Sequence, residues 1–165
     1  LIKNEHRQSI LHLSTVQTQH PLQQLGEQQA KAVLDELDYV GVMTFEYFRK
    51  GEQLIANEVA PRVHNSGHWS IEGASVSQFE NHIRAIAGLP IANIQCRANV
   101  AMFNIIGKAC NEQAILKLEG AHLHMYHKAE KPGRKIGHIT FVHDDEQQFQ
   151  QGLQQISQLL NNDLG

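Results

Sequence analysis

The chain has 165 residues, of which 41% are hydrophobic, and a formal net charge of -3 at pH 7. This length suits one ordinary domain or two small ones, and the hydrophobic fraction is sufficient for a buried core. The interspersed charges leave no basic surface for nucleic acid, and no run of about 18 apolar residues could cross a membrane, so we expect neither partner.

Targeting and redox signals are sparse. The opening "LIKNEHRQSI" lacks the layout of a signal peptide and has no initiator Met, so we expect a piece of a longer cytoplasmic protein. Cys96 and Cys110 have no metal-binding spacing, which favours reduced thiols over a disulfide. Alternation in "HLHMYH" places His122 and His124 on one strand face and His127 on the other, where a structural role is favoured over a zinc site.

The first half of the chain alternates strand and helix patterns. Residues 10–16 are β-branched and predict a strand, and residues 21–39 carry apolar side chains at helical spacing. Residues 39–48 and 53–60 predict two strands joined across "RKGE".

A polar loop, 61–75, separates that hairpin from the next predicted helix. "SQFE" at 77–80 is a Ser-x-x-Glu capping box, and the helix should run to Gly88. Three further strands are predicted over 97–107, 121–127 and 135–142, followed by a helix over 144–162.

The carboxylates of the hairpin are the first candidate functional residues. If residues 51–53 form an odd-numbered loop, Glu46 lies opposite Glu58, with Cβ atoms about 5 Å apart. A two-residue turn at Lys50-Gly51 would instead send Glu58 to the other face. Facing carboxylates need compensation, either from a proton on one of them or from a bridging divalent cation. The alternative is that both side chains are merely exposed.

The loop after the hairpin is dense in donors. Arg62, His64, Asn65 and His68 lie within seven residues, and Ser66-Gly67 allows close approach of the backbone to a ligand. A metal-bridging hairpin beside an anion-binding loop indicates phosphoryl chemistry, with a nucleotide triphosphate and a second anionic substrate.

A second basic cluster lies in "HKAEKPGRK", residues 127–135. It comprises Lys128, Lys131, Arg134 and Lys135. We interpret it as a solvated turn unless it folds back over loop 61–69.

The motifs "APRVHNSGHW" and "GASVSQFENHIRAI", together with "KPGRKIGHI", closely resemble the 5-(carboxyamino)imidazole ribonucleotide synthase family of ATP-grasp enzymes. The resemblance runs through essentially the whole chain. It implies an α+β fold: the C-terminal half of an ATP-grasp lobe, with an antiparallel sheet and packed helices, over 1–92. A small β-rich C-terminal domain with a terminal helix, similar to a rudimentary single-hybrid motif, would follow over 93–165.

The resemblance also implies a reaction, the ATP- and bicarbonate-dependent carboxylation of 5-aminoimidazole ribonucleotide through carboxyphosphate. Its cofactors would be ATP and Mg²⁺, or Mn²⁺, and its form a homodimer. Site residues follow by motif: Glu46 and Glu58 as metal ligands; His6, Asn57 and Glu58 at the nucleotide; Arg62 and His64 in catalysis; and Arg62, His64, Asn65, Lys128 and Arg134 at the substrate.

Family members are longer than this chain. They carry in addition an N-terminal nucleotide-fold domain, a subdomain with a glycine loop over the phosphates, and a lysine that contacts ATP. We therefore expect residues 1–165 alone to be inactive. Two alternatives remain open: another ATP-grasp carboxylase or ligase, and a noncatalytic binding or oligomerisation module.

Overall fold

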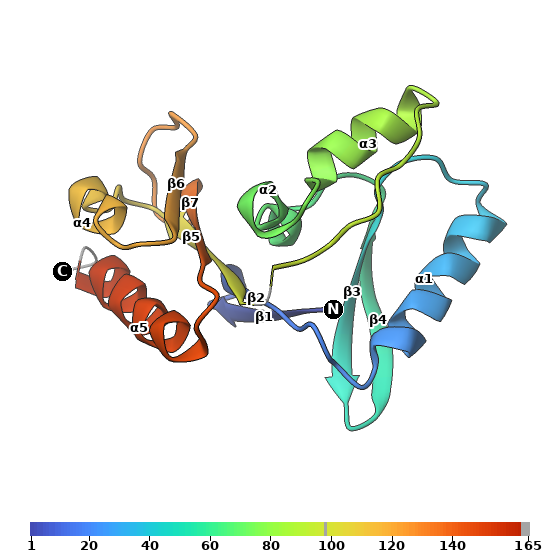
Figure 1. Cartoon of the computed structure of the whole chain (residues 1–165), viewed down its shortest axis with the longest axis horizontal. Coiled ribbons are helices and arrows are strands. Elements are labelled where there is room, and N and C mark those ends of the chain that lie inside the picture. The colour runs from blue at the N-terminus through green and yellow to red at the C-terminus, as the bar shows by residue number, and fades with distance from the viewer. Residues whose placement is uncertain (98, 163–165) are drawn as a thin grey trace.

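The computed structural model describes residues 1–97 and 99–162, and its centre is a five-stranded antiparallel sheet. The strand order is β1-β2-β5-β7-β6. The bounds are Ile2–Arg7 for β1, Ile10–Val16 for β2, Val100–Ile106 for β5, Ala121–Met125 for β6 and Lys135–Val142 for β7. The sheet therefore joins the first strands of the chain to the last ones (Figure 1).

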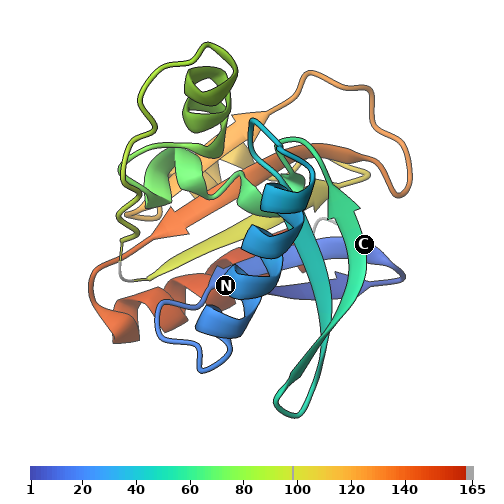
Figure 2. The ribbon, with the colours of Figure 1, turned by 90° about the vertical axis from the view of Figure 1, so that its right-hand side faces the viewer.

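A separate two-stranded hairpin, β3 (Thr44–Lys50) and β4 (Gln53–Ala60), stands apart from this sheet. Helix α1 (Gln23–Glu36) runs beside it, as Figure 2 shows, and α3 (Gln78–Ile86) lies on the same side of the molecule in Figure 1. The hairpin, α1 and α3 thus form one lobe, and the five-stranded sheet with its covering helices forms the other.

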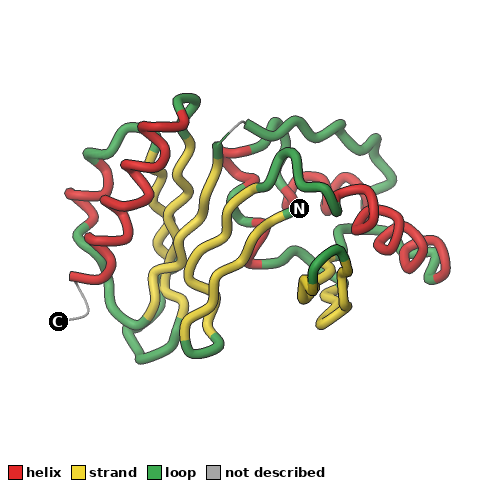
Figure 3. Tube along the Cα trace, turned by 90° about the horizontal axis from the view of Figure 1, so that it is seen from below, coloured by secondary structure: helices red, strands yellow, loops and turns green. Residues whose placement is uncertain are grey.

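One face of the sheet is covered by α4 (Glu112–Leu116) and α5 (Glu146–Asn162), which form a layer of their own in Figure 3. Strand alternation explains this packing, because Ala101, Phe103 and Ile105 of β5 point into the same apolar cluster as the buried face of α5. Phe141 of β7 stacks on Phe149 of α5 with ring centroids 5.6 Å apart.

The alternate residues of β5 face the opposite side. Val100 and Met102 are 0% exposed and pack against Trp69, just before the short helix α2 (Ser70–Gly73). Asn104 follows in the same alternation and is only 2% exposed. A buried amide on this face needs partners, and it finds them in the polar loop described below.

Most predicted elements are present. The strands at 10–16, 53–60 and 135–142 are confirmed at their predicted bounds. The predicted helix 21–39 is shorter, ending at Glu36, and the strand predicted from 39 begins only at Thr44. The strand predicted over 97–107 spans Val100–Ile106; residue 98 lies outside the described residues.

Several elements have no counterpart in the sequence predictions, including α2 and a 3₁₀ helix at Asn65–Gly67, which both lie in the predicted loop 61–75. Strand β1 was not predicted, because four of its six side chains are exposed and its pattern lacks an apolar face. Helix α4 is only five residues long, too short for a periodic signal.

The capping box before α3 is half formed. Ser77 Oγ accepts the Glu80 N–H at 3.1 Å, but the Glu80 carboxylate pairs with Arg84 instead of reaching back to Ser77. Strand β6 ends at Met125, so the face predicted for His127 is wrong: that residue has a φ of 52° and lies outside the strand. His122 and His124 share a face as predicted.

Neither Cys96, which is exposed, nor Cys110, which is buried, forms a disulfide within the described residues. Within residues 1–97 and 99–162, no helix is long and apolar enough to cross a membrane. The division into 1–92 and 93–165 stays a prediction; the five-stranded sheet takes strands from both sides of it.

Candidate active site

The two hairpin carboxylates lie opposite each other. Glu46 is the register partner of Glu58, so their side chains leave the same face of the hairpin. The reason for this pairing is not the odd-numbered loop that we expected. The turn between the strands has two residues, with Lys50 opposite Gln53. The odd residue is Asn57, which forms a β-bulge between the Glu46–Glu58 and Tyr47–Ala56 pairs.

The loop after the hairpin is held in shape by one side chain, Gln78 of α3. Its Oε1 accepts the His64 N–H at 3.0 Å, and its Nε2 donates to the His64 carbonyl at 2.8 Å and to His68 Nδ1 at 2.9 Å. Gly67 makes room for this clamp, because a Cβ there would lie 2.6 Å from Gln78 Oε1. The loop is therefore a fixed structure rather than a flexible connection.

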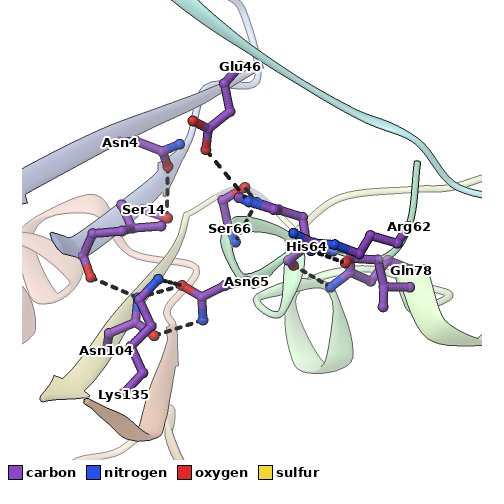
Figure 4. A network of polar contacts seen from close by, with 12 residues as sticks. Asn4, Ser14, Glu46, Arg62, His64, Asn65, Ser66, Gln78, Asn104 and Lys135 are labelled. Carbon is purple, nitrogen blue, oxygen red and sulfur yellow. Dashed lines mark hydrogen bonds and ion pairs between the residues drawn. The ribbon is translucent and has the colours of Figure 1, made fainter. Parts of the chain in front are cut away.

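His64 caps a short 3₁₀ helix, Asn65–Gly67. Its Nδ1 accepts the Ser66 backbone N–H at 3.3 Å and lies 2.9 Å from Ser66 Oγ. An Nδ1 that accepts places the proton of the neutral ring on Nε2, which points to Glu46 Oε1 at 3.7 Å (Figure 4). Burial lowers the pKa of His64, while Glu46 opposes this shift, so the ring is a neutral Nε2–H donor near pH 7.

Asn65 docks the same loop onto the sheet. Its amide and that of Asn104 form a reciprocal pair, with Nδ2 to Oδ1 distances of 2.8 and 2.7 Å. Asn104 also donates to the Leu11 carbonyl at 3.0 Å, and Lys135 Nζ donates to Asn65 Oδ1 at 2.9 Å. Figure 4 shows how this network joins the hairpin, the loop and the sheet.

A pocket of about 460 Å³ opens where these elements meet. It is lined by residues from the hairpin, the loop, the β1–β2 turn and the basic turn before β7. Five of the residues predicted from the sequence line it, together with Lys135, to which no role was assigned: His6, Glu46, His64, Lys128 and Arg134. The basic turn thus does fold back onto the loop.

The other predicted residues lie next to this pocket or on its supports. Arg62 is exposed, and its guanidinium donates to the Val63 carbonyl at 3.1 Å. Burial is the main cause of the lowered pKa of His64; Glu46 raises this pKa, and the positive charge of Arg62 lowers it further. Asn57 and Glu58 are exposed on β4, and Glu58 contributes to the electrostatic field at His64. Asn65 is engaged with Asn104 and Lys135.

The paired carboxylates suit a hard divalent cation that is shared with phosphate groups. Glu46 and Glu58 offer carboxylate oxygens on one face, but the described residues contain no group of three metal-ligating side chains. Mg²⁺ is usually held by one or two carboxylates, with phosphate and water oxygens completing its shell. The donor set therefore fits Mg²⁺ bound together with a nucleotide rather than by the protein alone.

A second group of ionisable side chains lies behind the loop and away from the pocket. His138 of β7 stacks on His124 at 4.4 Å, lies 5.3 Å from the ring of His68, and has Nδ1 2.7 Å from the Tyr126 hydroxyl. Burial lowers the pKa of His138 to about 3 and that of His68 to about 4. The rings of His68 and His138 therefore pack the loop onto the sheet as neutral groups.

Three residues of the network had no predicted role: Gln78, Asn104 and Lys135. Gln78 was noticed only as part of a capping box. Asn104 is a single polar residue in an otherwise apolar strand, and nothing else in the sequence indicates that it belongs to the site. Lys135 was grouped with the solvated turn, although it is the first residue of β7. Their roles depend on contacts between segments far apart in sequence.

Comparison with known proteins gives consistent results. Residues 1–79 match the ATP-grasp domain, and residues 100–152 match the phosphoribosylaminoimidazole carboxylase C-terminal domain. The chain is 47% identical over 160 residues to N5-carboxyaminoimidazole ribonucleotide synthase of Pseudomonas aeruginosa, covering 97% of this chain and 44% of that protein. It thus spans less than half the length of that relative.

Solved structures agree with these matches. The N5-carboxyaminoimidazole ribonucleotide synthetase of Thermus thermophilus superposes with a TM-score of 0.92 at 48% identity, covering 96% of this chain and 45% of that one. A synthase from Aspergillus clavatus, in complex with ADP and 5-aminoimidazole ribonucleotide, superposes with a TM-score of 0.87 at 32% identity, covering 97% and 46% of the two chains.

Proposed function

Since the chain belongs to the N5-carboxyaminoimidazole ribonucleotide synthase family of ATP-grasp enzymes, we propose that it supplies one side of the site that carboxylates 5-aminoimidazole ribonucleotide. The whole protein would be an ATP-dependent carbon–nitrogen ligase of purine biosynthesis. The observation that carries this proposal is the pocket that gathers a carboxylate of the hairpin, the loop histidine and the basic turn.

In this proposal Glu46 and Glu58 would be the residues that hold Mg²⁺ or Mn²⁺. The cation would supply charge neutralisation at the transferring phosphoryl group. Asn57, in the bulge beside Glu58, and His6, at the pocket wall, lie at the nucleotide. The Aspergillus clavatus relative with bound ADP supports a nucleotide site in this fold.

The resemblance to the family implies two steps. A bicarbonate oxygen attacks the γ-phosphorus of ATP, breaking the bond to ADP and forming carboxyphosphate. The exocyclic amine of the ribonucleotide then attacks the carboxyl carbon, phosphate leaves, and the amine loses a proton. Carboxyphosphate is short-lived in water, so the site must exclude water and hold the amine close.

His64 and Arg62 act on the acyl phosphate in this scheme. The neutral His64 ring donates from Nε2, so it orients an anionic oxygen rather than removing the amine proton. Arg62, next to the ring, stabilises negative charge as the phosphoryl group moves. Exposed Lys128 and Arg134 at the pocket rim reach the phosphate of the ribonucleotide, and Asn65 supports the loop that faces the substrate.

The test is calorimetric titration of the chain with Mg·ADP. We expect binding that weakens by about tenfold in Glu58→Gln, because a charged metal ligand is lost. Glu52→Gln is the matched control, since Glu52 lies in the turn of the same hairpin and has no predicted role.

Binding that is equal in Glu58→Gln and the wild-type chain would favour a noncatalytic module with exposed carboxylates. Binding of Mg·ADP without any affinity for 5-aminoimidazole ribonucleotide would favour another ATP-grasp ligase.

Two parts of the proposal concern the assembly. Residues 1–165 alone are expected to show no ATP-dependent carboxylation, which an assay for ADP release in the presence of all substrates would check. The whole protein is proposed to be a homodimer. Ile83 and Ile86 of α3 and Ile91 after it are 57, 58 and 64% exposed, which leaves apolar surface for a partner. Sedimentation velocity of the whole protein would show a monomer if this is wrong.

A further inference from the structure

A second cavity, of about 720 Å³, lies on the α5 face of the five-stranded sheet, and we call it the α5 cavity. Its floor consists of side chains from the apolar cluster under α5: Leu13, Phe103, Ile105, Cys110, Leu153 and Leu160. The loop of the candidate active site instead docks on the other face of the sheet, through Asn65 and Asn104. Of the described residues, Ile10 and Gly133 alone line both cavities, so the two are separate sites.

The floor of the α5 cavity keeps apolar surface open to a ligand. Leu13 of β2 and Leu153 and Leu160 of α5 belong to the apolar cluster, but each of them is only partly buried. Ligand pockets in proteins usually have volumes of roughly 300–1,000 Å³ and mainly apolar linings. The α5 cavity therefore has the size and lining of a small-molecule site, and a ligand that covered the three leucines would remove their surface from water.

The rim of the α5 cavity carries positive charge. Arg7 of β1 and Lys108, after β5, both line it. The one carboxylate among the described lining residues, Glu5, forms an ion pair with Lys3 at 2.8 Å, so its charge is already balanced. The two remaining charged residues of the lining are cations, which favours an anionic ligand.

The ring of His12, which also lines the cavity, lies in the same positive field. Burial is the main cause of the lowered pKa of His12, and the charges of Arg7, His6 and Lys135 lower it further. An anion placed at this wall would meet attraction from these cations.

The lining also limits which anions fit. The side chains of the floor are apolar except for the Cys110 thiol, which is a weak donor. The hydroxyl groups of a sugar or nucleotide would lose hydrogen bonds to water there without replacing them. The floor therefore suits an apolar body, and the charged head of such a ligand belongs at the rim.

We propose that the α5 cavity binds a small amphipathic anion, with its apolar body against the three leucines and its anionic head beside Arg7 and Lys108. The ligand class is a carboxylate or similar monoanion on an aliphatic or aromatic body. This inference is independent of the proposed function, because none of the residues given a role in that function lines the α5 cavity.

The first test is a fluorescence titration of the chain with anilinonaphthalene sulfonate, an aromatic monoanion, which is excited directly. We expect Ser157→Trp to weaken binding by at least about tenfold, because Ser157 of α5 lines the cavity and an indole there takes the space of the apolar body. Gln154→Trp is the matched control, since Gln154 is exposed on the same helix and is not part of the lining.

The second test separates the charged head from the apolar body. Decanoate should displace the dye, and decanamide, which has the same chain and a neutral head, should displace it less well. We expect the double variant Arg7→Gln/Lys108→Gln to weaken decanoate by about fivefold, because two charged partners are lost at exposed positions, and to leave decanamide unchanged. The double variant Lys50→Gln/Lys117→Gln removes the same net charge away from the cavity and is the control.

Three results would overturn the inference. They are dye binding that is equal in Ser157→Trp and the wild-type chain, dye binding that is weakened as much in Gln154→Trp, and decanamide that competes as well as decanoate in every protein. Urea unfolding of each variant shows whether it is folded. If Ser157→Trp is unfolded, the two double variants decide, because all four of their substituted side chains are exposed.

Discussion

At the scale of single residues, the site is organised by amides rather than by charges. Gln78 holds His64 and His68, and Asn104 holds Asn65, so two neutral side chains determine where the ionisable ones point. Neutral amides can both donate and accept, which lets one side chain satisfy several groups of a folded loop. The loop therefore keeps its shape without a ligand.

The Gln78 clamp leads to a prediction about stability. Gln78→Leu keeps a similar volume but leaves the His64 N–H and carbonyl without their partners, so we expect the free energy of unfolding to fall by about 2–3 kcal/mol. Urea denaturation would measure this. Gln28→Leu, on the exposed side of α1, is the control. A fall in Gln78→Leu no larger than in Gln28→Leu would show that the clamp contributes nothing.

Sequence reasoning found the reactive residues better than their supports. His6, Glu46, His64, Lys128 and Arg134 were all singled out, and they do meet at one pocket. Gln78, Asn104 and Lys135 were given no role in the site, because an amide in a helix or strand, or a lysine at a strand start, carries no signal until its distant partner is known. The roles of the predicted residues stay predictions until they are tested.

At the scale of elements, the hairpin shows how a correct pairing can rest on an incorrect mechanism. Glu46 lies opposite Glu58 as predicted, but a bulge at Asn57 supplies the odd residue and the turn has only two. Bulge positions depend on packing and twist, which local sequence does not encode. The start of β3 at Thr44 and the presence of β1 also depend on tertiary contacts, which is why the local sequence did not predict them.

The hairpin turn gives a prediction that isolates backbone strain. Gly51 has a φ of 60°, and a Cβ there would meet nothing within 4 Å, so Gly51→Val adds no clash beyond its own backbone. A β-branched residue in this region costs about 1–3 kcal/mol. We therefore expect amide hydrogen exchange in β3 and β4 to accelerate by at least about fivefold. Glu52→Val, one residue on, should leave exchange nearly unchanged; equal effects would argue against the turn geometry.

At the scale of the whole molecule, the contact between loop and sheet depends on uncharged histidines. The pKa of His138 is about 3 and that of His68 about 4 in the folded chain, against about 6.5 when unfolded. Between these pKa values, the two histidines are protonated in the unfolded chain but not in the folded chain. Stability is complete above pH 6.5 and is lost as the pH falls towards 4 and then 3.

The resulting prediction concerns acid unfolding. Between pH 6.5 and 4, the free energy of unfolding should fall by up to about 1.4 kcal/mol per pH unit for each of the two histidines. His138→Phe should make this slope shallower, and His122→Phe, exposed on β6, should not. Chemical denaturation at several pH values would measure the slopes. Identical slopes in all three proteins would mean that His138 is not the group responsible.

The strand order also constrains how such a protein could be rearranged by recombination. Strand β5 lies between β2 and β7, and its residues from Val100 to Ile105 are at most 5% exposed. A crossover between β2 and β5 would pair the first two strands of one parent with the last three strands of another, and any mismatch at the β2–β5 pair would weaken the sheet at its centre. The two ends of this chain are therefore expected to be inherited as a matched pair, although most of the sequence separates them.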